Sequence, residues 1–305
     1  IWRDCMLKVN DISKNFGSLK AVRNLSFSVE KGEVLGIVGQ NGAGKSTTFK
    51  MILGYLQPDN GKVTINNRYV SEEILDRIGF LPEERGLYLD MTIQQQIEYF
   101  ASLHGVTKKD SKERLAYWLE KLEVKGHKKT KIKDLSKGNQ QKIQLICTLI
   151  HKPEFLILDE PFSGLDPINI DILLSVITEL REEGVAIIFS SHNMQNVARI
   201  SDKILMLVNG RAALYGNIND IRSMYESRKL YVEGISIDKI NRTPGITKYS
   251  LDYPGYIIEF SSNLQVLNAI NIYKKDIELS GYRIIIPTLD DIFKIVLKGE
   301  KNEKD

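Results

Sequence analysis

A short stretch in the first fifth of the chain has the residue types and spacing of a phosphate-binding loop. It has the sequence GQNGAGKST and matches the pattern G-x-x-x-x-G-K-[ST] at Gly39, Gly44, Lys45 and Ser46. Backbone N–H groups of a glycine-rich turn and of a helix N-terminus can donate to several phosphate oxygens. The Lys side chain of this pattern reaches the β- and γ-phosphates, and the Ser hydroxyl meets Mg²⁺. The candidate contacts are Gly39, Gln40, Asn41, Gly42, Ala43, Gly44, Lys45, Ser46 and Thr47.

The segments on either side of the loop have the character that such a site needs. EVLGIVG, before the loop, is a nearly continuous apolar run, which is typical of a strand covered on both faces. TTFKMILGYL, after the loop, favours a helix. The alternative is a glycine-rich strand-to-helix turn with a surface Lys, which the strand, the spacing and the composition together disfavour. The stretch therefore predicts binding of a nucleoside triphosphate.

An acidic pair follows a second apolar strand. FLIL is followed directly by Asp159 and Glu160. A carboxylate at a strand end suits Mg²⁺ held through water, which we expect of Asp159, and Glu160 is placed to polarise an attacking water. An acidic strand end at the surface is the common alternative, but it is less favoured in a chain that already has a phosphate loop.

The order of the elements predicts an α/β fold with a parallel sheet. Two alternating runs, MLKVNDIS and LSFSVEKG, indicate strands at the start of the chain. The region from Asp90 to Lys152 has helical character, and Cys147 lies on the apolar face of its last helix. Strands FLILDE, VAIIFSS and KILMLV follow, with a helix between the first two. Alternation of strands and helices implies a parallel sheet with helices on its faces.

The pattern changes after about Tyr215. The segments KLYVEGI, GYIIEFS, LQVLNAINIYKK, GYRIIIP and LDDIFKIVLKG predict strand, strand, helix, strand and helix. We therefore expect a small α+β domain over residues 228–298. Residues 1–5 are expected to lie outside the fold, with Met6 as a natural start.

Composition is that of an ordinary globular protein. The 305 residues are 42% hydrophobic and 27% charged, and a net charge of +3 gives no argument for nucleic acid as a partner. Two Cys residues do not imply a disulfide framework. No apolar run approaches the roughly 18 residues of a membrane span, and no secretory signal is visible.

Three further motifs give the chain a family resemblance. They are LSKGN, which begins at Leu135, SGLD, which ends at Asp166, and His192 at the end of IIFSSH. With the phosphate loop and the acidic pair, they resemble the nucleotide-binding domain of ATP-binding cassette (ABC) proteins in type and order, from about Leu7 to Tyr215. The resemblance implies a P-loop NTPase fold with a parallel core sheet, an antiparallel β subdomain and a helical subdomain. We expect this domain over residues 6–220 and its helical part over about 88–152.

The resemblance implies that LSKGN acts on the nucleotide of a second subunit. Ser136, the N–H of Gly138 and Asn139 would face the γ-phosphate bound by the partner, and Asp166 would lie in a loop at the dimer interface. The family pattern is L-S-G-G-Q, and this chain departs from it at Lys137 and Asn139. Asn139 keeps an amide group, and no contact is assigned to Lys137.

Other roles also come from the resemblance. Phe16 would stack on adenine, with a core position in a strand as the alternative. Glu83 lies where most members have Gln, and it would meet Mg²⁺ directly or through water and link the site to the membrane partner. His192 would hydrogen-bond the γ-phosphate and orient the water. The basic run from His127 to Asp134 is interpreted as a solvated face, with binding to anionic lipid or to a partner as the alternative.

The stretch LPEERGLY and the appended domain ending in IPTLDDIF are similar to bacterial exporter ATPases related to the sodium-efflux ATP-binding subunit. The resemblance implies an ATPase that uses ATP and Mg²⁺, pairs with itself or a paralogue, and drives a separate permease chain at the cytoplasmic face of the membrane. The cargo stays open among sodium, an antimicrobial peptide, a drug and a lipid-like molecule. A soluble ABC ATPase acting on ribosomes or DNA is the main alternative. A P-loop kinase or GTPase is disfavoured, because no N-K-x-D motif is present.

Overall fold

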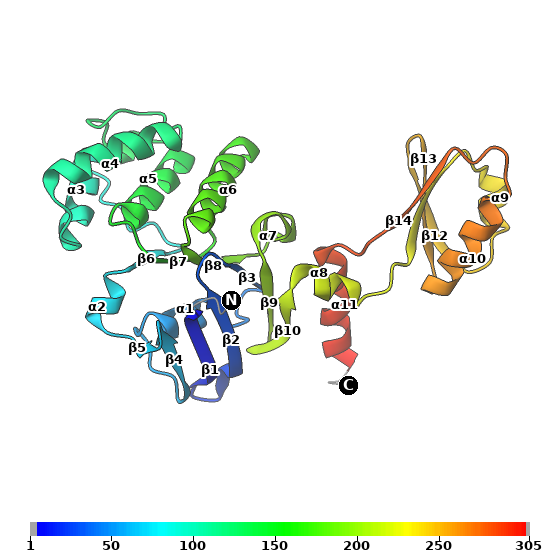
Figure 1. The fold of residues 1–305 in the computed structure, drawn as a ribbon, viewed down its shortest axis with the longest axis horizontal. Coiled ribbons are helices and arrows are strands. Elements are labelled where there is room, and N and C mark those ends of the chain that lie inside the picture. The colour runs from blue at the N-terminus through cyan, green and yellow to red at the C-terminus, as the bar shows by residue number, and fades with distance from the viewer. Residues whose placement is uncertain (1–4, 303–305) are drawn as a thin grey trace. The chain divides into compact units, whose positions relative to one another are not determined.

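The computed structural model describes residues 5–302, and it describes side chains for residues 5–299. The chain forms two compact units that join between Asn217 and Ile218 (Figure 1). The segment expected to lie outside the fold, residues 1–5, falls outside the described residues except for Cys5, which begins strand β1. None of the helices within the described range has the length and apolar character of a membrane-spanning helix.

The central sheet of the first unit carries the strands that precede the predicted site. Its order is β10-β9-β3-β8-β7-β6, and only β10 runs antiparallel to its neighbour. The strands are β3 (Val34–Gly39), β6 (Ile78–Leu81), β7 (Phe155–Leu158), β8 (Ala186–Ser191), β9 (Lys203–Val208) and β10 (Arg211–Asn217). Because β3, β8 and β7 are parallel neighbours, the loops after their carboxyl ends meet at one edge of the sheet.

A second, antiparallel sheet has the order β2-β1-β4-β5. Its strands are β1 (Cys5–Phe16), β2 (Leu19–Glu30), β4 (Asn60–Ile65) and β5 (Arg68–Tyr69). The alternating apolar residues of β1 and β2 are buried together with those of β3 and helix α1 (Lys45–Ile52) in one core. The first two strands are longer than the runs that predicted them, since their outer ends form an exposed hairpin.

The remaining helices of this unit surround the sheets. They are α2 (Glu72–Leu75), α3 (Ile93–Leu103), α4 (Lys108–Lys121), the 3-10 turn η1 (Ile132–Asp134), α5 (Lys137–Leu149), α6 (Pro167–Glu182) and α7 (Met194–Ile200). Helix α3 begins with a capping box, in which Thr92 and Gln95 satisfy each other's backbone N–H groups. Helix α5 is buried from Gln141 to Leu149. Burial raises the pKa of Cys147 to about 12, as befits a core thiol.

The second unit is a βαββαβ sandwich with one added helix before it, α8, and one after it, α11. Its elements are α8 (Ile218–Ser223), β11 (Lys229–Glu233), α9 (Ile237–Asn241), β12 (Ile246–Asp252), β13 (Gly255–Phe260), α10 (Asn263–Tyr273), β14 (Gly281–Ile285) and α11 (Leu289–Asn302). The sheet order β12-β13-β11-β14, with all neighbours antiparallel, is that of a ferredoxin-like fold. The predicted element order omitted α9 and β12 and was wrong there, because β12 is an edge strand whose residues are mostly exposed and so lack a clear apolar pattern.

Candidate functional site

The phosphate loop connects β3 to α1, as the sequence pattern predicts. Gly44 has a φ of 105°, and a Cβ at this position would lie 2.6 Å from the carbonyl oxygen of Ala21 in β2. Only Gly fits both the backbone conformation and this close approach. The Nζ atom of Lys45 donates to the carbonyl oxygen of Gly39 at 2.9 Å. This contact holds the ammonium group across its own loop, beside the free N–H groups at the start of α1.

The acidic strand end lies directly against the phosphate loop. The hydroxyl of Ser46 donates to Oδ2 of Asp159 at 3.0 Å, although 113 positions separate the two residues. Ser190, which is fully buried, donates to Oδ1 of Asp159 at 2.6 Å. Its hydroxyl oxygen also accepts from the backbone N–H of Glu160 at 2.8 Å. Sequence reasoning missed Ser190, because a Ser near the end of a strand carries no signal of what lies in the neighbouring strand.

Glu160 and His192 meet across the ends of β7 and β8. Nδ1 of His192 lies 3.0 Å from Oε2 of Glu160. The Glu160 side chain is only 10% exposed, whereas that of His192 is 75% exposed. Glu160 also has a φ of 50°, which is an uncommon conformation for a residue other than Gly. The strand end therefore fixes the carboxylate under an open imidazole group.

These residues fit a magnesium nucleotide. Mg²⁺ in nucleotide sites takes one or two protein oxygens and completes its shell with phosphate and water. The hydroxyl of Ser46 and the carboxylate of Asp159 form such an oxygen pair. Within the described residues, no group of three or more His, Cys, Asp or Glu side chains could hold a metal ion.

The LSKGN segment forms the start of α5 and does not enter the phosphate loop. Ser136 is the N-cap of α5, and its hydroxyl oxygen accepts from the backbone N–H of Asn139 at 3.3 Å. The side-chain oxygen Oδ1 of Asn139 accepts from the backbone N–H of Lys125 at 2.9 Å, so this side-chain amide is partly engaged within the chain. Ser136 and Lys137 are exposed. The start of the helix therefore presents N–H groups and a hydroxyl to solvent, as an anion site does.

The SGLD loop adjoins this segment. Asp166 is the N-cap of α6, and its Oδ1 accepts from the backbone N–H of Asn169 at 2.9 Å. That hydrogen bond lowers the pKa of Asp166. A Cβ on Gly138 would lie 3.6 Å from the Leu165 side chain and 3.9 Å from Asn169 Nδ2. The predicted trans-acting residues and the predicted interface loop thus share one face of the first unit.

Phe16 and Glu83 lie on the surface. Phe16 ends β1 and is 50% exposed, so the alternative of a core position is wrong. Glu83 follows β6 and is exposed. Gln144 of α5, which sequence reasoning missed, donates to the carbonyl oxygens of Pro82 at 3.0 Å and Glu84 at 3.3 Å. The loop that carries Glu83 is therefore bound to the helix that begins at the LSKGN segment.

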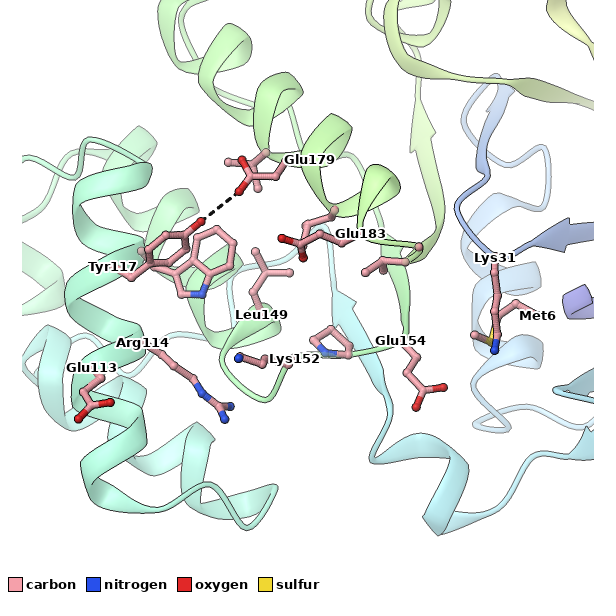
Figure 2. Close-up of a pocket in the computed structure, with 16 residues that line it drawn as sticks. Met6, Lys31, Glu113, Arg114, Tyr117, Leu149, Lys152, Glu154, Glu179 and Glu183 are labelled. Carbon is pink, nitrogen blue, oxygen red and sulfur yellow. Dashed lines mark hydrogen bonds between the residues drawn. The ribbon is translucent and has the colours of Figure 1, made fainter. Parts of the chain in front are cut away.

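A separate cleft of 740 Å³ lies between α4 and α6 (Figure 2). It is next to Glu154, just before β7, and thus at the amino end of the strand whose carboxyl end carries the acidic pair. The residues that line it include none of the predicted site residues. Tyr117 of α4 donates to Glu179 of α6 at 3.1 Å across this cleft, and Lys121 forms an ion pair with the same carboxylate. The cleft marks where the helical segment is joined to the core.

The convergence of phosphate loop, carboxylate pair and His on neighbouring parallel strands defines a P-loop NTPase. A family model described as ABC transporter matches residues 22–163. The ABC transporter ATP-binding protein YhaQ of Bacillus subtilis is 41% identical over 227 residues, which cover 74% of this chain and 76% of that protein. The chain therefore belongs to the ATP-binding proteins of ABC transporters, and it is an ATPase of that family.

Two further relatives are also ATP-binding proteins. The linearmycin resistance ATP-binding protein LnrL of Bacillus subtilis is 35% identical, covering 72% of this chain and 71% of that protein. The ABC transporter ATP-binding protein NatA of the same organism is 34% identical, covering 73% of this chain and 93% of that protein. A solved ATP-binding subunit of an ABC transporter superposes with a TM-score of 0.67 at 31% identity, covering 72% of this chain and 92% of that chain.

Proposed function

We propose that the chain is the ATPase subunit of an exporter, in which two copies, or one copy and a paralogue, close over two Mg²⁺–ATP. The dimer would drive a separate membrane permease from the cytoplasmic face. The observation that supports this proposal is the division of the site between two surfaces. The phosphate loop, Asp159 and Glu160 are joined by hydrogen bonds at one edge of the sheet. Ser136 hydrogen-bonds to Asn139, and a Cβ added at Gly138 would lie 3.6 Å from the Leu165 side chain, so both residues lie outside the phosphate loop.

Each side chain has a task that its position supports. Lys45 would leave the carbonyl of Gly39 and pair with the β- and γ-phosphates, and Phe16 would stack on adenine from its exposed position. Glu160 would accept a proton from the attacking water, with His192 holding the carboxylate and contacting the γ-phosphate. Bound Mg²⁺ would neutralise phosphate charge, and Ser46 and Asp159 would hold it, with Glu83 nearby. Ser190 would keep the Asp159 carboxylate and the Glu160 backbone in place.

The cargo is proposed only as a class. The name of LnrL, a linearmycin resistance protein, supports export of an antimicrobial compound. The proposed cargo classes also include sodium and drugs. Cargo contacts are expected in the permease, so the membrane protein that co-purifies with this chain would identify the transport system. A soluble ATPase acting on ribosomes or DNA is supported by no specific feature, and recovery of ribosomes instead of a membrane protein would favour it.

The experiment uses Glu160→Gln, which keeps the size of the side chain and removes its charge. Hydrolysis should slow by about 10²–10⁴, because a positioned base is lost. Loss of repulsion toward the γ-phosphate should let ATP hold the dimer closed. Light scattering of the full chain, and of the chain bound to its co-purified permease, should then show an ATP-dependent dimer.

A second change tests whether the LSKGN segment acts in trans. Ser136→Asp preserves the N-cap of α5, because Asp caps helices as well as Ser does. The new carboxylate would face the partner's γ-phosphate, so in the Glu160→Gln background the ATP-dependent dimer should disappear. Ser175→Asp, on the exposed face of α6, is the matched control and should leave the dimer intact. A dimer that survives Ser136→Asp, both alone and with the permease, contradicts the proposal.

A further inference from the structure

Strand β14 is an open edge of the sheet in the second unit. Within residues 5–302 it pairs with β11 on one side and with no strand on the other, because the sheet order ends at β14. Every second residue of such an edge strand directs its N–H and C=O groups away from the sheet, where another strand can pair with them. The edge of β14 is regular, since its pairing with β11 runs from Gly281 to Ile285 without a register shift.

One face of β14 carries an apolar stripe that is covered only in part, since the ammonium group of Lys274 lies over the Tyr282 ring at 5.3 Å. Tyr282 and Ile284 pair with Val232 and Leu230 of β11, so all four side chains lie on the same face of the sheet. Val232 and Leu230 are fully buried in the core beneath the helices. Tyr282 is 42% exposed and Ile284 41%, and Ile286, directly after the last residue of β14, is 64% exposed. In Figure 1 the helices α9 and α10 lie on one side of the strands, and the core that they form includes no residue of β14.

The opposite edge of the sheet is protected in ways that β14 is not. Strand β12 has a register shift between its pairs at Ile246 and Lys248, and it ends at Asp252. Charges and irregular pairing on an edge discourage another strand from adding to it. The charged residue of β14 is Arg283. Its guanidinium lies over the Tyr231 ring at 5.0 Å, on the face of the sheet opposite to the apolar stripe. The sheet is thus open to strand addition along β14.

We infer that β14 pairs with β14 of a second copy of this chain, antiparallel and about a two-fold axis at Ile284. This register places Tyr282 opposite Ile286 of the second copy, and an aromatic residue opposite a β-branched one is a favourable cross-strand pair. It also places Arg283 opposite Ile285, so no like charges meet. An axis at Arg283 would instead set two guanidinium groups face to face, which is unfavourable. The apolar stripes of the two copies would join into one.

This interface goes beyond the proposed function, because it involves no nucleotide and none of the residues placed in the ATP site. Sedimentation velocity of the full chain without nucleotide should show a dimer whose fraction rises with protein concentration. Ile284→Lys should raise the dissociation constant about tenfold or more, because two ammonium groups would meet at the axis. Leu251→Lys, on the exposed edge strand β12, is the matched control and should leave the dimer unchanged. ATPase activity should survive both changes, and circular dichroism with thermal melts checks that the second unit of each variant, which carries the substitution, stays folded.

Cross-linking tests the register. In a Cys5→Ser background, Ile284→Cys should form a disulfide-linked dimer on mild oxidation, since directly opposite residues bring their Cβ atoms to about 4.5–5.5 Å. Arg283→Cys should not, because its counterpart would lie diagonally across the axis. Cys147 is buried and remains in place. A chain that stays monomeric without nucleotide, a dimer unaffected by Ile284→Lys, or cross-linking at Arg283→Cys in preference would each overturn the inference. Ser136→Asp should not affect the β14 dimer, whereas it should abolish the ATP-dependent dimer. The two dimers can therefore be tested, and can fail, independently of each other.

Discussion

Nδ1 of His192 lies 3.0 Å from Oε2 of Glu160, and the two residues follow neighbouring parallel strands. One of the pair is nearly buried and the other is open to solvent. The contact therefore orients the carboxylate while it leaves most of the imidazole exposed. Because strands β7 and β8 are fixed side by side from Phe155 to Leu158, the geometry is set by the sheet and not by a mobile loop.

We predict that His192→Ala slows hydrolysis by about 10²-fold or more, because the base loses its partner and the γ-phosphate loses a contact. ATP binding should weaken far less than turnover. The measurement is a comparison of kcat with the dissociation constant for ATP. His127→Ala removes an exposed His outside the site and is the control. Equal turnover of the His192 and His127 variants would exclude a role for His192.

We predict that Lys45→Ala weakens ATP binding and nearly abolishes hydrolysis. The charge-assisted hydrogen bonds to phosphate that it removes are worth about 1.5–3 kcal/mol each. Lys50→Ala, at the exposed other end of α1, should be neutral. Calorimetric titration with ATP measures the effect, and circular dichroism checks the fold. Turnover at the unmodified level would show that GQNGAGKST is not the phosphate loop.

A chain that ends after Asn217 should remain folded and should bind ATP, because the predicted nucleotide residues of its own site precede that point. The unit boundary falls here, and Tyr215 hydrogen-bonds through its hydroxyl to both the N–H and the C=O of Ser28. A chain that ends after Val208 loses β10 and these two bonds, and it should melt at a lower temperature. Fluorescent ATP titration and thermal melts of both chains give the answer. A folded chain ending at Asn217 that cannot bind ATP would assign part of the site to the second unit.

Stability should fall between about pH 6.5 and pH 4 because of His151. Burial, and next the neighbouring His104 ring stacked on it at 3.9 Å, lower the pKa of His151 to about 4 from 6.5. Asp76 partly offsets this and Arg114 adds to it. In that pH range the unfolded chain binds a proton that the folded chain does not, so the free energy of unfolding decreases as pH falls.

His151→Phe should lower the number of protons that the chain takes up on unfolding in this pH range by up to about one, which makes the free energy of unfolding less dependent on pH. The variant also loses the 3.2 Å contact between Nε2 and the Ile78 carbonyl, so its overall stability should decrease. The slope of melting temperature against pH, and not the absolute stability, is therefore the readout. His127→Phe, at an exposed position, should keep the slope of the parent chain. An unchanged slope in the His151 variant would assign the acid sensitivity to other groups.

Local sequence patterns predicted those elements that depend only on residues a few positions apart in the chain. The phosphate loop required a strand, a glycine-rich turn and a helix start in one continuous stretch, and the structure has them from Val34 to Ile52. The acidic pair required only a buried strand before it, and β7 is buried throughout. Strand β12 was missed because an exposed edge strand needs no apolar alternation.

The sequence by itself determined the P-loop fold and the family, because spacing within a loop and at strand ends is a local property of the chain. Only the tertiary structure decided which of these ends meet. The strand order β3-β8-β7 places Ser190 between Asp159 and the Glu160 backbone, and it sets His192 against Glu160. Strand order follows from the packing of a whole sheet, so no single stretch encodes it. The same is true of β14, whose apolar residues predict burial but whose place at the edge leaves them exposed.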